Sequence, residues 1–341
     1  MKKGYKALWK SIIRPPRETY SDFDLGPSEF TLSGKPYKRT DFSLANINGY
    51  WMKCSHFEPF DSERTADLLP CVIYLHGNSS SRTEGLVAVP LILPMNATLV
   101  VFDFAGCGIS DGEYISLGWN ERHDLRKLIT YLKENRRVGK IGLWGRSMGA
   151  ATAIFYACAN DDIHSMVLDS PFASLKELAT ELGSNYTRLP NFVRKLLYSM
   201  IRKTVKKKAK FDINEINPID QIDTCIQPAL FGAGIQDLFV RPHHTQDLYD
   251  KYPGEKDIIL FEGDHNSIRP KFFHESVSRF FYLTLMCDQL PETLKSAIPE
   301  FNGKVSQGED LLKEMKEDEE AMLKWALDES VKLMREQKDP E

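Results

Sequence analysis

Residues 142–150 read G-L-W-G-R-S-M-G-A, so Ser147 stands between Gly145 and Gly149. A short apolar run precedes the serine, and a run with helical character, 148–159, follows it. A serine at the junction of a buried strand and a helix is typical of a sharp turn that strains the backbone and exposes the hydroxyl. The two glycines let strand and helix approach closely. The same residues also fit an ordinary helix N-cap serine.

The pattern around this turn repeats along the chain. Short, near-continuous apolar runs alternate with amphipathic runs, which favours a parallel sheet covered on both faces. The strands are expected at 71–75, 97–102, 140–144, 165–168, 228–231 and 257–261, and the helices at 120–135, 148–159, 243–252 and 271–287. The predicted fold class is therefore α/β, with a mostly parallel sheet of about eight strands, helices on both faces and a short helical cap.

Two features mark the limits of this domain. Asn48-Gly49 lies between two alternating segments, and this dipeptide supplies the positive φ angles of a tight hairpin, so an antiparallel pair should begin the sheet. The segment 171–224 is long, helical and basic, and it is expected to form a cap over the sheet. The predicted organisation is an N-terminal basic arm (1–40), a main domain (41–288), a linker (289–308) and a C-terminal helix (309–338).

Composition excludes several classes of function. The chain has 341 residues, a formal net charge of -4 and 42% hydrophobic residues, which supports a large folded core and gives no overall case for nucleic-acid binding. We find no signal peptide and no run near the ~20 apolar residues that span a bilayer. The six cysteines are scattered, without a C-x-x-C pair. We therefore expect a reduced, cytoplasmic protein without a disulfide or zinc framework.

A serine hydroxyl needs a base to become a nucleophile, and the base needs a carboxylate to orient it. His265 follows the expected strand 257–261 and is the best candidate base among eight histidines. Asp237 follows the expected strand 228–231 and is the matching acid. The chain order Ser147, Asp237, His265 is the order expected for this architecture.

Other histidines and acids are weaker candidates. Asp169 also ends an expected strand and is the alternative acid, whereas Asp264 adjoins His265 in sequence and is expected to shape its loop. Four further histidines are weaker candidates than His265, and surface or core roles suit them better: His164, His243, His244 and His274.

Two backbone N–H groups are predicted to bind a developing oxyanion. Met148 lies in the first turn of the helix after Ser147, where free amides and the helix dipole favour negative charge. Asn78 lies in the His76-Gly77-Asn78 loop after the expected strand 71–75, and Gly77 lets the backbone come close. His76 is better suited to packing of this loop than to catalysis.

These motifs together resemble the α/β-hydrolase superfamily, most closely its serine-aminopeptidase-like and acyl-thioesterase-like branch. The resemblance is carried by residues 145–149, 76–78, 103–110 and 264–265 and covers about residues 40–288. It implies a serine hydrolase with a helical cap and no metal or organic cofactor. The loop 103–110 resembles the loop after the family's fourth strand and is expected to be structural.

The C-terminal segment 317–333 resembles a ubiquitin-interacting motif. It begins with acidic residues and places Leu323, Ala326 and Ser330 on one helical face, so the small Ala326 could lie close to a partner. Ala321 and Leu333 depart from that pattern because they replace acidic residues. The alternative is an amphipathic helix that packs on its own domain or self-associates.

The sequence as a whole predicts an acyl hydrolase that cleaves an ester or thioester. Alternatives are an aminopeptidase-like amide hydrolase and a catalytically idle scaffold that binds ubiquitinated partners. Expected partners are a small acyl substrate or acylated protein, with ubiquitin for the tail and no nucleic acid. Six basic residues precede the first acidic one, so contact with an anionic membrane is an alternative to a solvated arm: Lys2, Lys3, Lys6, Lys10, Arg14 and Arg17.

Overall fold

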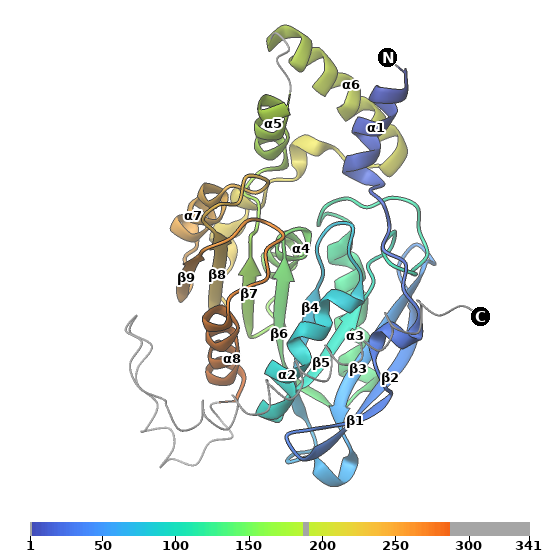
Figure 1. Ribbon diagram of the computed structural model, residues 1–341, viewed down its shortest axis with the longest axis vertical. Helices are drawn as coiled ribbons and strands as arrows, with labels where there is room; N and C mark the ends of the chain where they lie inside the picture. Colours follow the sequence, from blue (N-terminus) through green and yellow to red (C-terminus); the bar gives the residue numbers. More distant parts are fainter. Residues whose placement is uncertain (1, 187–190, 287–341) are drawn as a thin grey trace, which may run out of the picture.

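A single twisted sheet of nine strands forms the centre of the described part of the chain, in the order β1-β2-β3-β5-β4-β6-β7-β8-β9 (Figure 1). The computed structural model describes residues 2–186 and 191–286. The strands are β1 (Glu29–Leu32), β2 (Lys35–Ala45), β3 (Trp51–Pro59), β4 (Leu69–Leu75), β5 (Thr98–Phe102), β6 (Val138–Arg146), β7 (Ser165–Asp169), β8 (Ala229–Gly234) and β9 (Lys256–Phe261). The pairs β1–β2, β2–β3 and β3–β5 are antiparallel and all the others are parallel. The predicted α/β fold is confirmed.

Helices cover both faces of the sheet, as the near-continuous apolar strands require. Along β4, Cys71, Ile73 and Leu75 belong to one core and Val72 and Tyr74 to the other, because successive side chains point to opposite faces. The first core also contains buried residues of α3 (Glu121–Asn135), α4 (Met148–Ala157) and α7 (Pro242–Lys251). The second contains residues of α2 (Val89–Ile92) and α8 (Lys271–Met286).

A helical cap lies beyond the carboxyl ends of the parallel strands (Figure 1). It contains α5 (Leu175–Tyr186) and α6 (Asn191–Ala209), and it falls between β7 and β8, as predicted for the insertion. Short 3₁₀ helices complete the described elements: η1 (Asp22–Leu25), η2 (Asp61–Glu63), η3 (Arg82–Ala88), η4 (Leu93–Met95), η5 (Ile213–Glu215), η6 (Pro218–Asp220) and η7 (Ile222–Thr224).

The N-terminal segment is more ordered than an arm laid over the domain. Its first helix, α1 (Lys2–Ile13), packs beside α6, and the Tyr5 hydroxyl donates to the Met200 carbonyl at 2.9 Å (Figure 1). Ile13 is fully buried. Strand β1 and the start of β2 also lie within residues 1–40, so the sheet begins inside the segment predicted to be an arm.

The β2–β3 hairpin is confirmed, but the predicted turn geometry is wrong. Only Gly49 has a positive φ, of 79°. Asn46 closes a wider loop instead: its amide donates to the Tyr50 carbonyl, and its side-chain oxygen accepts the amides of Asn48 and Tyr50. The side chain of Asn46 therefore provides the hydrogen bonds that a two-residue turn would have taken from the backbone.

The described cysteines are free thiols, and all but Cys158 are buried. The Cys158 and Cys225 sulfurs lie 2.7 Å apart where the end of α4 meets the segment before β8. Within the described residues, no helix is long and apolar enough to cross a membrane. Cys287, the predicted linker and the predicted C-terminal helix lie outside the described residues.

Candidate active site

Ser147 occupies a strained turn between β6 and α4. Its φ and ψ are 53° and -111°, outside the conformations that a serine usually adopts. A Cβ atom on Gly145 would lie 2.4 Å from the Gly149 carbonyl oxygen, and one on Gly149 would lie 1.9 Å from the Leu75 carbonyl oxygen. Only glycines fit at these two positions because strand and helix approach so closely.

The Ser147 hydroxyl makes no capping hydrogen bond to α4, which argues against the N-cap interpretation. Its Oγ lies 3.1 Å from Nε2 of His265, on the loop after β9. The other ring nitrogen, Nδ1, lies 2.6 Å from Oδ2 of Asp237, on the loop after β8. The structure thus brings together the three side chains that the sequence singled out.

The Asp237 carboxylate is held in place from both ends. Its side chain is fully buried, and its Oδ1 accepts the amides of Phe239 and Val240 at 2.9 and 2.8 Å. These bonds leave Oδ2 for the imidazole. A buried carboxylate in this position fixes the ring orientation and stabilises the imidazolium that forms when the base takes a proton.

Two arginines that the sequence analysis did not single out hold the histidine loop. Arg146 Nη2 donates to the His265 carbonyl at 2.9 Å, and Arg269 Nη1 donates to the same carbonyl at 3.3 Å. Asp264 shapes the loop, as expected: its Oδ1 accepts the amides of Asn266 and Ser267 at 2.8 Å. These hydrogen bonds, the Asn266 amide first, lower the pKa of Asp264.

Asp169, the alternative acid, has a different partner. Its carboxylate accepts two hydrogen bonds from Arg269, at 2.8 Å from Nε and 2.9 Å from Nη2, and both side chains are buried. A buried guanidinium in this arrangement occupies both carboxylate oxygens. The geometry therefore favours Asp237 over Asp169 as the partner of His265.

The two candidate oxyanion donors adjoin the serine turn. Met148 begins α4, and Gly77, beside Asn78, would place a Cβ only 3.8 Å from the Arg146 carbonyl oxygen. Within residues 2–186 and 191–286, neither the Met148 nor the Asn78 amide donates to a protein acceptor. Both N–H groups are thus available to a ligand.

One carboxylate connects the Asn78 loop to the serine turn. Glu84 Oε2 accepts the Gly77 amide at 2.6 Å, and Glu84 Oε1 pairs with Arg146 at 2.8 Å. Arg146 in turn holds the His265 carbonyl. The Asn78 loop, the serine turn and the histidine loop are therefore joined by the Glu84 and Arg146 side chains.

The other histidines have structural surroundings. His76 is buried, its Nε2 accepts the Phe104 amide at 3.2 Å and its Nδ1 lies 2.8 Å from the Gly77 carbonyl, so it packs the loop as expected. His164 Nδ1 accepts the Ile141 amide, and the His274 ring packs against Trp144. His243 and His244 begin α7 and face the cap.

The loop 103–110 is structural, as expected. The buried Asp103 carboxylate accepts the amides of Arg82 and Ile109 at 2.6 and 2.9 Å and the Tyr20 hydroxyl at 2.6 Å. A Cβ on Gly108 would lie 2.3 Å from this carboxylate. The glycine therefore serves close packing around Asp103.

Comparison with known proteins agrees with this architecture. The family model described as alpha/beta hydrolase fold matches residues 70–214. The uncharacterized protein YqkD of Bacillus subtilis is 32% identical over 234 residues, which are 67% of this chain and 73% of that protein. The chain therefore belongs to the α/β-hydrolase family.

More distant relatives share the fold. The lysophosphatidylserine lipase ABHD12 of Danio rerio is 24% identical over 50% of this chain and 47% of its own length. The Pyrococcus furiosus esterase Pf2001 has a TM-score of 0.61 at 22% identity over 80% of this chain and 98% of its own. An acetyl xylan esterase from Paenibacillus sp. R4 has a TM-score of 0.59 at 17% identity over 83% of this chain and 93% of its own. These similarities concern the architecture.

Proposed function

We propose that this protein is a serine hydrolase that cleaves a carboxylic ester or thioester through an acyl-enzyme. The observation that carries the proposal is a pair of contacts made by the His265 ring. Its Nε2 lies 3.1 Å from Ser147 Oγ, and its Nδ1 lies 2.6 Å from Asp237 Oδ2. A hydroxyl, a base and a buried carboxylate in this order are what nucleophilic acyl transfer requires.

In the proposed reaction, Ser147 attacks the acyl carbonyl while His265 takes its proton. The Met148 and Asn78 amides bind the oxyanion, and His265 returns the proton to the leaving alcohol or thiol. Water then attacks the acyl-enzyme, with His265 again as the base, and releases the carboxylic acid and Ser147. No cofactor is needed in these steps, because the serine, the base and the oxyanion donors are all supplied by the chain.

Exposed apolar side chains beside the histidine favour an acyl chain as the substrate group. Leu238 is 73% exposed and Ile268 is 93% exposed, and the Phe239 ring lies 5.0 Å from the His265 ring. Leu238 and Phe239 follow Asp237 directly, and Ile268 is three residues beyond His265. Apolar groups that are left exposed next to a reactive centre indicate a binding surface for an apolar substrate.

The test is the hydrolysis of p-nitrophenyl esters by purified Ser147→Ala. Because the members of a triad act as a unit, we expect turnover to fall by about 10³-fold or more. Ser199→Ala, on the exposed side of α6, is the matched control and should retain normal turnover. Near-normal turnover of Ser147→Ala would rule out the proposed nucleophile.

A substrate panel separates the alternatives that the sequence left open. Esters, acyl thioesters and aminoacyl anilides are compared by kcat/KM, and the proposal expects esters or thioesters to exceed the anilide. A higher kcat/KM for the anilide would favour an aminopeptidase-like enzyme. A folded protein without activity on any of the three classes would favour the scaffold.

A further inference from the structure

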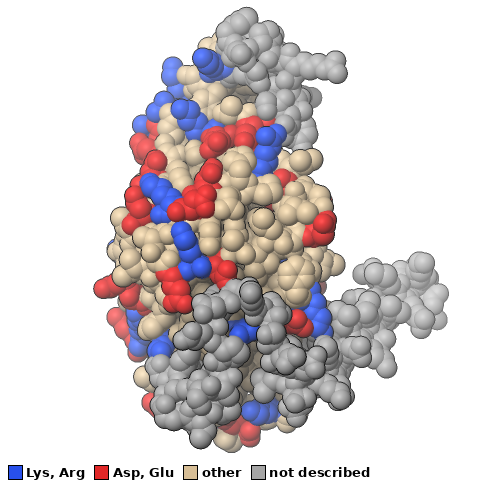
Figure 2. Space-filling model, turned by 90° about the vertical axis from the view of Figure 1, so that its left-hand side faces the viewer, with Lys and Arg blue, Asp and Glu red and all other residues tan. Residues whose placement is uncertain are grey.

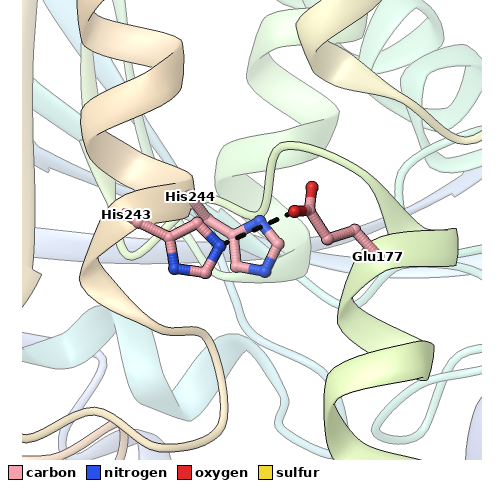
Figure 3. A group of neighbouring side chains, drawn as sticks. All are labelled: Glu177, His243 and His244. Atoms are coloured by element: carbon pink, nitrogen blue, oxygen red, sulfur yellow. Dashed lines mark ion pairs between the residues drawn. The ribbon is translucent and has the colours of Figure 1, made fainter.

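A compact group of histidine and carboxylate side chains lies between α5 of the cap and α7 of the main domain. Glu177 and Glu181 come from α5, and His243 and His244 come from the first turn of α7. Figure 3 shows the two imidazoles facing Glu177 across the junction, with a contact between His243 and Glu177. The glutamates and the histidines are about sixty positions apart in the sequence, so no local sequence motif indicates this group.

The separations between these side chains suit a tetrahedral metal ion. His243 Nε2 lies 3.3 Å from Glu181 Oε1 and 3.8 Å from Glu177 Oε1, and His244 Nε2 lies 3.4 Å from Glu181 Oε2. The ligand atoms of Glu177, His243 and His244 all lie within 4.8 Å of one another. A tetrahedral ion with bonds of about 2.1 Å to nitrogen and oxygen separates its ligands by roughly 3.4 Å.

His244 provides an independent indication of a ligand. Its side chain is fully buried, and its Nε2 has no hydrogen-bond partner among the described residues. The nearest carboxylate oxygen is Glu181 Oε2, at 3.4 Å. A buried ring nitrogen without a hydrogen bond is costly unless something binds it.

The charges around the group also suit a divalent cation. Glu177 and Glu181 contribute two negative charges, His243 is partly exposed, and Arg241 is the neighbouring cation, at 3.7 Å from Glu181 Oε2. The two carboxylates outweigh the arginine beside them. Two imidazoles with carboxylates are a donor set that zinc and related transition metals accept, whereas calcium and magnesium prefer oxygen ligands alone.

We propose that Glu177, His243 and His244 form a binding site for Zn²⁺ or a closely related divalent transition-metal ion, with the Glu181 carboxylate beside it. The site joins α5 to α7, which begins two residues after Val240, the residue whose amide holds Asp237. The ion would thus fasten the cap to the segment that carries the triad acid. Its role is structural, since the site contains no triad residue.

Metal binding requires one local adjustment. The Ala173 amide contacts His244 Nδ1 at 3.4 Å, so the ring proton of the free protein is on Nε2. Coordination through Nε2 displaces that proton and puts one on Nδ1, so the long Ala173 contact opens.

The test is Zn²⁺ binding to the full-length, untagged protein after treatment with a chelator. Titration calorimetry and elemental analysis should find one bound ion per chain, and Co²⁺ should give the intense visible absorption of tetrahedral coordination. His243→Ala and Glu177→Gln, both at partly exposed positions, should each weaken binding by about 10-fold to 100-fold or more. Because these side chains are not buried, their replacement leaves the fold intact and keeps the test decisive.

Two controls separate this site from other metal ligands. His123→Ala, on α3, and Cys158→Ser, at the Cys158–Cys225 pair, should bind Zn²⁺ as the wild type does. Absence of stoichiometric binding, unchanged affinity in His243→Ala, or loss of binding in Cys158→Ser instead would overturn the proposal. Ser147→Ala should bind zinc normally, so failure of the metal site and failure of the proposed hydrolase are distinguishable.

Discussion

The serine turn shows how single residues set the geometry of the candidate site. Ser147 tolerates a φ of 53° because the surrounding packing leaves its backbone no relaxed alternative. Its amide donates to the Asp169 carbonyl at 2.8 Å, which holds the turn against β7. Asp169 itself is held by Arg269, so the alternative acid contributes to the shape of the site.

Gly149→Ala should destabilise the protein. The new methyl group would lie 1.9 Å from the Leu75 carbonyl oxygen, so backbone must move, at a cost of at least about 2 kcal/mol. Gly139→Ala is the matched control, since its methyl group would lie 3.6 Å from Leu68 in ordinary contact. Chemical denaturation measures both, and equal free energies of unfolding for the two variants would contradict the close approach.

Asp124 should make stability depend on pH. Burial raises the pKa of its carboxyl from 3.8 to about 7, although the Ala105 amide and the Asn46 side chain donate to it. Between these values the folded protein keeps a proton that the unfolded chain releases, so this stabilisation is lost as the pH rises toward 7. Asp124→Asn carries no such proton.

From about pH 5 to about pH 8, the free energy of unfolding of the wild type should therefore fall relative to that of Asp124→Asn, by roughly 1–3 kcal/mol. Free energies of unfolding in guanidinium at the two pH values measure the change. Asp247→Asn, at an exposed position of α7, should follow the wild type. If the free energies of unfolding of Asp124→Asn and the wild type change equally with pH, Asp124 does not hold the proton.

The candidate residues that follow strands could be predicted from the sequence, whereas the arginines that hold the histidine loop could not. Ser147, Asp237 and His265 each come after an apolar run, and they follow one another in the chain order expected for this architecture. Arg146 and Arg269 bind a backbone carbonyl, which any residue offers, so no pattern in the sequence marks that contact. An arginine between the two residues Gly145 and Ser147 was the one available signal.

At the scale of elements, α1 and α6 form a basic surface. The stretch from Arg202 to Lys210 carries six basic residues and no acidic one. Its five lysines are all exposed: Lys203, Lys206, Lys207, Lys208 and Lys210. Leu196 and Met200 are exposed on α6, and they share one face of the helix with Lys203 and Lys207, because these residues are three or four apart. Figure 2 shows acidic and basic side chains interspersed on another face of the molecule.

We expect this surface to bind anionic vesicles. Each lysine near such a surface contributes about 1 kcal/mol, so Lys203→Glu/Lys207→Glu should weaken binding by about 30-fold or more at low salt. Arg126→Glu/Lys127→Glu, on exposed positions of α3, is the charge-matched control. Co-sedimentation with phosphatidylserine-containing and pure phosphatidylcholine vesicles is the measurement. Equal pelleting with both kinds of vesicle would refute an electrostatic interaction.

The elements that could be predicted are those with a strong apolar pattern. The six parallel strands are nearly all apolar, and their predicted centres agree with β4 to β9. Strand β1 has four residues, of which only Leu32 is buried, so its pattern is too short to recognise. Helix α1 is stabilised by packing against α6, a contact between segments about 190 residues apart.

At the scale of the whole molecule, the candidate site residues and the proposed metal site belong to the main domain and the cap. The C-terminal segment lies outside the described residues and contributes none of the candidate site residues. Deletion of residues 304–341 should therefore leave ester turnover within about twofold of the wild type. A large loss of turnover would indicate that the segment supports the cap.

The same segment should bind ubiquitin weakly if its resemblance to a ubiquitin-interacting motif is functional. One short helix buries little surface and must become ordered on binding. Titration of labelled ubiquitin with the peptide 309–338 measures this by NMR. Ala326→Gln, which keeps helix propensity but blocks close approach, should abolish the shifts. Absence of shifts with the unmodified peptide would leave the packing-helix interpretation.

The most direct measurement of the proposed chemistry is covalent labelling of the unmodified protein with a fluorophosphonate, followed by peptide mass spectrometry. These reagents phosphorylate a serine only when a base activates it. We predict one adduct per chain, on the peptide that contains Ser147, with loss of ester hydrolysis in proportion to labelling. An adduct on a different residue, or ester hydrolysis that persists in fully labelled protein, would contradict Ser147 as the nucleophile.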